Sequence, residues 1–185
     1  MKFTARPIGS RTQGRSTRHM GRTVLAMVAA AAVLNVTTMA APSDRQTPRT
    51  PFEVLHVLDG DTLLAREPTD GRIDRVRLLG IDAPELAHPQ APADCYAGAA
   101  TEVLTRWLPA GSIVVLVGDA TQADRDRYGR LLRYVDHHGR DIATQLLLAG
   151  AARPDRGPNG LTRAADYERA AVEAQQHRRG LWGVC

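Results

Sequence analysis

Residues 52–81 read FEVLHVLDGDTLLAREPTDGRIDRVRLLGI, and this stretch decides the fold. Two strand-like, largely apolar runs cover 52–58 and 62–67, and Asp59-Gly60-Asp61 separates them. Aspartate and glycine dominate short hairpin turns, so the pattern predicts two antiparallel strands joined by a tight turn. A third strand is predicted over 75–81.

The elements expected after this stretch set the fold class. The spacing of apolar residues and the positions of Pro, Gly and a capping Asp predict a helix over 96–108, strands over 113–117 and 131–135, and helices over 142–149 and about 162–179. A parallel sheet would need a helix between every pair of strands. Five short strands with one helix after the third therefore predict an α+β fold, a five-stranded OB-fold barrel with three helices.

The N-terminal segment has the composition of a targeting sequence. Residues 1–43 carry six basic side chains and no acid, and an apolar run with small residues follows the basic part. This pattern predicts a signal peptide over 1–41, a proline-containing linker over 42–51 and one domain over 52–185. The expected location is secreted or periplasmic, with no stable membrane association after cleavage. An uncleaved anchor and an organelle transit peptide are the alternatives.

Most of the positive charge belongs to this segment. The whole chain carries a net charge of +4, with 24 Lys and Arg against 20 Asp and Glu. Without the six N-terminal basic residues, 18 basic residues face 20 acidic ones, which leaves about −2. Any attraction of the domain to phosphate must therefore come from individually placed arginines.

The chain has two cysteines, Cys95 and Cys185, both in the exported part. An even number of cysteines in an oxidising compartment predicts a disulfide, with two free thiols as the alternative. In the chain-entropy model, closing so long a loop removes roughly 4 to 5 kcal/mol of unfolded-state entropy.

Three acidic residues, Asp61, Asp82 and Glu85, follow predicted turns or strand ends between residues 59 and 85. Asp61 lies at the exit of the predicted hairpin, and Asp82 lies at the exit of the third strand. Carboxylate oxygens are the ligands that Ca²⁺ and Mg²⁺ prefer. Glu85 follows on a loop stiffened by Pro84, where it can accept a proton from water as a general base. A simple hairpin turn at Asp61 and a solvated loop residue at Glu85 are the alternatives.

Arg77 and Arg130 are the candidates to bind a phosphate group. A guanidinium stays charged and offers paired donors that match two phosphate oxygens. Arg77 and Asp82 are five positions apart, so a regular strand would point them to opposite faces. Gly80 lies between them, and we expect a bulge or an early strand exit there to bring both to one rim.

Three strings occur in the order and at the separations of a known family. They are Asp59-Gly60-Asp61-Thr62, Arg77-Leu78-Leu79-Gly80-Ile81-Asp82-Ala83-Pro84-Glu85 and Asp126-Arg127-Tyr128-Gly129-Arg130. Together with Gly180-Leu181-Trp182 they resemble the staphylococcal nuclease (thermonuclease) family over about residues 52–182.

The resemblance implies a phosphodiesterase that cuts DNA and RNA between phosphorus and the 5′ oxygen and leaves 3′-phosphates. One Ca²⁺ would be held by Asp61, Asp82 and the carbonyl of Ala83. Glu85 would activate water, and Arg77 and Arg130 would bind the phosphate. The remaining implied roles are phosphate contacts by Arg127 and Tyr128, and a bridge between Cys95 and Cys185 as in some secreted relatives. A monomer with little sequence specificity is expected.

Two departures from the family pattern matter. Ala83 replaces a threonine, which a ligand acting through its carbonyl tolerates. The two tyrosines that flank the nucleotide in the prototype are absent from 153–158, where Arg153 and Arg156 are the candidate substitutes. A non-catalytic nucleic-acid-binding OB module and a structural interaction domain are the alternative functions.

Overall fold

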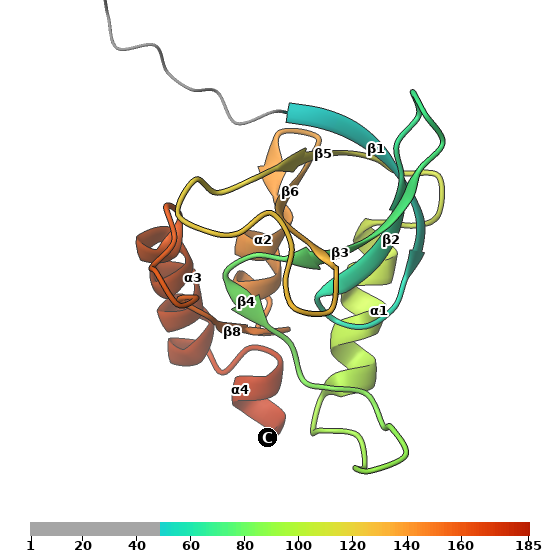
Figure 1. Cartoon of the computed structure of the whole chain (residues 1–185). Coiled ribbons are helices and arrows are strands. Elements are labelled where there is room, and N and C mark those ends of the chain that lie inside the picture. The colour runs from blue at the N-terminus through green and yellow to red at the C-terminus, as the bar shows by residue number, and fades with distance from the viewer. Residues whose placement is uncertain (1–48) are drawn as a thin grey trace, which may run out of the picture. The chain divides into compact units, whose positions relative to one another are not determined.

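Five strands form a closed barrel in the computed structural model, which describes residues 49–185 (Figure 1). The strands are β1 (Arg49–Val57), β2 (Thr62–Arg66), β3 (Ile73–Leu78), β5 (Ile113–Val117) and β6 (Leu131–His137), with the short β7 (Arg140–Asp141) at one edge. Their order is β3-β2-β1-β5-β6, and parallel pairing of β3 with β6 closes the barrel. This confirms the predicted OB fold. The predicted signal peptide and residues 42–48 of the predicted linker lie outside the described residues.

The barrel begins earlier than the sequence indicated. The sequence predicts that residues 49–51 belong to the linker, but in the structure they belong to β1 and pair with Val117, Leu116 and Val115 of β5. Pro51 is accommodated because β1 is paired on one side only at this point, its pairing with β2 starting at Glu53.

A bulge in β1 sets which side chains face the barrel interior. The register with β2 shifts between Val54 and His56. Val54 and Val57 are consequently both buried although they are three residues apart. On β2 the alternation is regular, and Leu63 and Ala65 are fully buried. The core is therefore continuous around the hairpin of β1 and β2, whose turn contains Asp61.

Three helices pack around the barrel as predicted, and a fourth short helix follows them. They are α1 (Ala97–Trp107), α2 (Ile142–Leu148), α3 (Ala164–Gln176) and α4 (Leu181–Val184). The predicted cap of α2 is present, because the Asp141 side chain accepts a hydrogen bond from the Ala143 N–H at 3.0 Å. None of the helices within residues 49–185 has the length and apolar character needed to cross a membrane.

A second, two-stranded sheet was not predicted. It pairs β4 (Ile81–Asp82) with β8 (Arg153–Pro154), with Asp82 opposite Arg153. Each strand has two residues, too few for a periodic pattern, and the partners are about seventy positions apart. This sheet joins the end of the third barrel strand to the segment that leads into α3 (Figure 1).

A buried carboxylate ties the barrel to the segment that leads into α3. Asp119 is 8% exposed and accepts hydrogen bonds from the Tyr134 hydroxyl and from the backbone N–H groups of Thr121 and Thr162. Burial raises the cost of its charge, but these hydrogen bonds prevail and hold the pKa of Asp119 far below its usual range. The carboxylate is therefore ionised in the folded protein at all ordinary pH values.

Replacing Asp119 by Asn should destabilise the protein by about 2 to 3 kcal/mol at pH 7, because an amide cannot accept all these hydrogen bonds. The folded-state pKa is depressed, so this stabilisation exists above the unfolded pKa near 4 and is lost as the pH falls below it. Urea unfolding at pH 7 and at about pH 3 measures the difference. Asp166→Asn, an exposed carboxylate on α3, is the control. An equal effect of Asp119→Asn at both pH values would contradict the assignment.

Candidate active site

Arg77 lies between two carboxylates at one end of the barrel. It is on β3 opposite Thr62, the residue that follows Asp61. Its Nε is 3.1 Å from Asp61 Oδ1, and its Nη2 is 3.2 Å from Asp82 Oδ1. Its Nη1 donates to the carbonyl oxygens of Leu78 and Ile81, at 2.7 and 2.6 Å. The structure thus brings together Asp61, Arg77 and Asp82, which come from three different strands or turns.

The early strand exit expected at Gly80 is present. β3 ends at Leu78, and Gly80 has a φ of +81°, a conformation that residues with a Cβ rarely adopt. A Cβ on Gly80 would lie 2.3 Å from a ring carbon of Tyr167. The turn lets Arg77 and Asp82 meet on one side although they are five positions apart.

Asp61 is the buried member of the cluster, at 4% exposure. Its Oδ1 accepts from the Thr62 hydroxyl at 3.0 Å and its Oδ2 from the Ala83 N–H at 2.9 Å. Burial raises the pKa of Asp61 to about 6, against the lowering effect of Arg77 and of the Ala83 N–H. Its negative charge is therefore costly and would be stabilised by a cation.

The donor chemistry of this cluster fits a hard divalent cation. Asp61 and Asp82 together carry two negative charges, and Arg77 supplies one positive charge between them. The oxygens of these carboxylates are suitable ligands for Ca²⁺. Ala83 lies beside Asp61, and the contact between them is made by its N–H. Within residues 49–185, no three His, Cys, Asp or Glu side chains are close enough to form a metal site by themselves.

The backbone of Glu85 is fixed by hydrogen bonds to Asp94, and its side chain is exposed. Its N–H donates to Asp94 Oδ2 at 3.0 Å, and the Asp94 N–H donates to the Glu85 carbonyl at 2.9 Å. Cys95, which follows Asp94 in the sequence, forms a disulfide with Cys185. The C-terminus is thereby tethered to the segment that fixes Glu85.

Arg130 lies beside both Glu85 and Arg77, because it lines a cavity with each of them. Asp126 Oδ2 accepts from its Nε at 2.7 Å, and Asp126 Oδ1 accepts from the backbone N–H groups of Tyr128 and Arg130. Burial opposes this charge, but the hydrogen bonds from Arg130 and from these N–H groups lower the pKa of Asp126. Arg130 lines one cavity of about 390 Å³ with Glu85, and a second of about 230 Å³ with Arg77.

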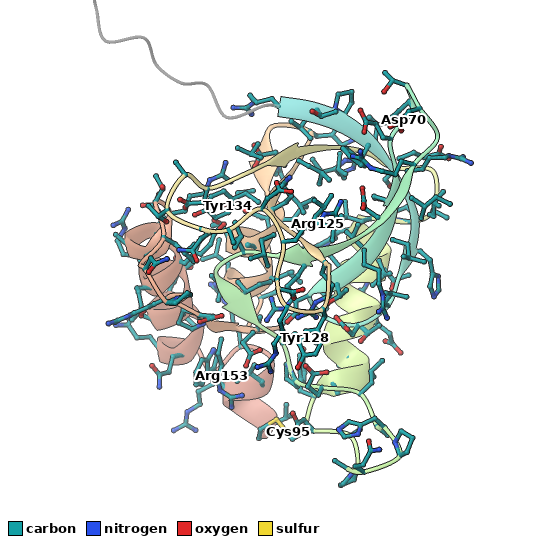
Figure 2. The ribbon with its side chains drawn as sticks, viewed as in Figure 1. Asp70, Cys95, Arg125, Tyr128, Tyr134 and Arg153 are labelled. Carbon is teal, nitrogen blue, oxygen red and sulfur yellow. A yellow bond between two sulfur atoms is a disulfide. The ribbon has the colours of Figure 1, made fainter. Side chains whose placement is uncertain are left out.

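Arg127 and Tyr128 form an exposed pair next to Arg130. Arg127 Nη2 donates to the Tyr128 hydroxyl at 2.7 Å, and its guanidinium carbon lies 4.8 Å from the ring centroid. The Arg130 guanidinium lies over the same ring at 5.4 Å. Figure 2 shows Tyr128 below the barrel, on the side of the segment that leads to Cys95. Tyr128 also lines the cavity that contains Glu85.

Three residues near the site have no role in the prediction from sequence. Arg75 lines the cavity with Glu85 and Arg130, and its position two residues before Arg77 on β3 was the available signal. Asp126 is the first residue of the string that ends at Arg130, and its hydrogen bond fixes the Arg130 guanidinium. Asp94 gave no local signal, because its contact with Glu85 depends on how the intervening loop closes.

An OB barrel that carries this acid–arginine cluster, with arginine-lined cavities beside it, is an OB-fold protein equipped to bind an anionic ligand. The chain belongs to the family of staphylococcal nuclease homologues, whose family model matches residues 75–184. It is similar to a thermonuclease of Staphylococcus intermedius, with 31% identity over 131 residues covering 71% of this chain and 75% of that protein.

Longer proteins also contain a similar segment. A probable endonuclease of Paracoccidioides lutzii is 34% identical over 123 residues, which cover 60% of this chain and 34% of that protein. A prophage-derived endonuclease of Bacillus subtilis is 29% identical over 126 residues, covering 68% of this chain and 41% of that protein.

Gly80→Ala should destabilise the protein by about 3 kcal/mol, since the left-handed backbone and the overlap with Tyr167 are both unfavourable. Gly71→Ala is the matched control, because Gly71 has a φ of +72° and open space where its Cβ would be. It should lose only about 1 kcal/mol. Thermal and urea unfolding measure both. Equal losses would mean that the contact with Tyr167 does not constrain the turn.

Proposed function

We propose that this protein is a secreted, calcium-dependent nuclease that hydrolyses phosphodiester bonds of DNA, RNA or both with little sequence specificity. The observation that carries the proposal is the position of Arg130, which lines one cavity with Glu85 and another with Arg77. The family and the relatives named thermonuclease and endonuclease support it.

The two arginines are suited to the charge of a phosphodiester. The reaction passes through a five-coordinate phosphorus with more negative charge than the substrate, so fixed guanidinium groups stabilise it. Asp126 binds Arg130 through Nε, and no other hydrogen bond to this guanidinium occurs within residues 49–185. The two terminal nitrogens of Arg130 are thus available to phosphate oxygens.

Asp61, Asp82 and the Ala83 carbonyl would hold one Ca²⁺. Such an ion supplies a Lewis acid that polarises the phosphate and acidifies a bound water. The raised pKa of Asp61 and the excess of carboxylates over arginines in the cluster support a cation there. The choice of Ca²⁺ over Mg²⁺ follows the family resemblance, since oxygen ligands accept both.

Glu85 would act as the general base. Its exposed carboxylate accepts the proton of the attacking water, whose oxygen forms the new bond to phosphorus. The bond from phosphorus to the 5′ oxygen breaks and this oxygen takes up a proton from solvent, so the products are a 3′-phosphate and a 5′-hydroxyl. The backbone contacts with Asp94 keep Glu85 in position for this step.

The Cys95–Cys185 disulfide supports export, because disulfides persist in oxidising compartments. A location in the periplasm or in the medium is consistent with the predicted signal peptide over 1–41. The segment's cleavage is part of the same proposal.

Cleavage of single-stranded DNA by the purified protein tests the function. We expect cleavage with Ca²⁺ and none with EDTA, a loss of about 10²- to 10⁴-fold in kcat for Glu85→Gln, and about 10³- to 10⁵-fold for Arg130→Ala. Arg169→Ala, an exposed arginine on α3, is the control and should keep full activity. Phosphatase treatment of the products identifies their 3′ ends. Binding of DNA without cleavage in Ca²⁺ would indicate a non-catalytic module instead.

A further inference from the structure

A groove of about 650 Å³ lies between the end of α1, the turn from β6 to β7 and the start of α2. Its polar and aromatic lining consists of Arg106, Trp107, His137, His138, Arg140 and Gln145. None of these residues lines the cavities that contain Arg77, Glu85 or Arg130. The groove is therefore separate from the candidate active site.

The charge of the groove is one-sided. No acidic residue lines it, and neither Arg106 nor Arg140 takes part in an ion pair within the described part of the chain. The acids on either side of the turn, Asp136 and Asp141, are both engaged by Arg163 Nη1 at 2.9 Å. Because residues 44–185 carry a net charge of about −2, the positive charge of this groove is local and does not reflect the charge of the domain as a whole.

The shape of the groove is fixed by the backbone of the turn. His138 has a φ of +49° and Gly139 a φ of +74°, and the two imidazole rings lie 4.0 Å apart between centroids. His137 Nδ1 is hydrogen-bonded to the Ile113 carbonyl at 3.0 Å. Trp107 is half-buried and packs against the core, so its indole is held in place at the edge of the groove.

We propose that this groove binds a single strand of nucleic acid at a second contact site for the polymer that is cut at the active site. Free guanidinium groups suit phosphates, and a fixed indole offers a surface on which a base of any identity can stack. The absence of acid from the lining removes the main repulsion of a polyanion. The inference rests on the proposed nuclease function and adds that long strands are bound more tightly than short ones.

Steady-state kinetics with two substrates test this. The double variant Arg106→Ala/Arg140→Ala should raise KM for a 30-nucleotide single strand about tenfold, with kcat unchanged. A dinucleotide is too short to reach from the active site to the groove. With this substrate, both KM and kcat should stay as in the unmutated protein. The slope of log KM against log salt should fall by about 1.4, as expected for two lost phosphate contacts on a single strand.

The matched control is Arg66→Ala/Arg169→Ala. It removes the same charge from two arginines that lie outside the groove and are paired with Glu53 and Asp166. It should leave KM for the long strand within about twofold of the unmutated value. Equal effects of the two double variants would overturn the proposal, because total charge and not the groove would then determine affinity.

Fluorescence of Trp107 gives a readout that does not depend on activity. The chain has two tryptophans, so Trp182→Phe leaves Trp107 alone, and the buried Trp182 Nε1 has no hydrogen-bond partner to lose. In EDTA, oligo(dT) of 30 nucleotides should quench this emission, and Arg106→Ala/Arg140→Ala should weaken the binding about tenfold. An unquenched Trp107 would overturn the proposal even if the protein cleaves DNA. Quenching without cleavage in Ca²⁺ would instead reject the nuclease function and keep the groove.

Discussion

The ion pairs of Arg77 with Asp61 and Asp82 are the interaction on which the site and the local fold both depend. Asp61 is almost fully buried, and a buried carboxylate without a partner would be strongly destabilising. Arg77 provides that partner and at the same time binds the carbonyls of Leu78 and Ile81, which flank the turn. One side chain thus compensates the charge in the interior and fixes the backbone that carries Asp82.

Elements distant in sequence hold this turn from the other side. Tyr167 on α3 packs against Gly80, and its hydroxyl donates to Asp141 at 2.7 Å, which also caps α2. The Asp155 N–H donates to the Gly80 carbonyl at 2.9 Å, beside the pairing of β4 with β8. The helical half of the domain therefore sets the geometry of the cluster at the barrel end, and it does so without contributing a side chain to the cluster.

The sequence predicted those features that depend on local pattern. The hairpin whose turn contains Asp61, the barrel strands, the three main helices and the cap at Asp141 follow from periodicity and turn chemistry over a few residues. The strand exit at Gly80 was predicted from a conflict, because Arg77 and Asp82 could not otherwise share a side. The pairing of β4 with β8 and the hold of Asp94 on Glu85 were not predictable, since both are contacts between segments that local periodicity does not relate.

The loop over residues 153–158, which lacks the two tyrosines of the family prototype, has its arginines engaged by other side chains. Arg156 is paired with Glu168 at 2.8 Å, and the Arg153 guanidinium lies 5.2 Å from the Trp182 ring centroid, near α4 in Figure 2. The loop residues that line the cavities around Arg130 are Asp155, Gly157 and Pro158, none of which offers an aromatic stacking surface or a positive charge for phosphate. Tyr128 is then the aromatic side chain at these cavities, and one ring binds a flexible strand weakly. The proposed second contact site would add to this binding, because among residues 49–185 the acid-free groove beside Trp107 combines arginines outside any ion pair with an aromatic ring.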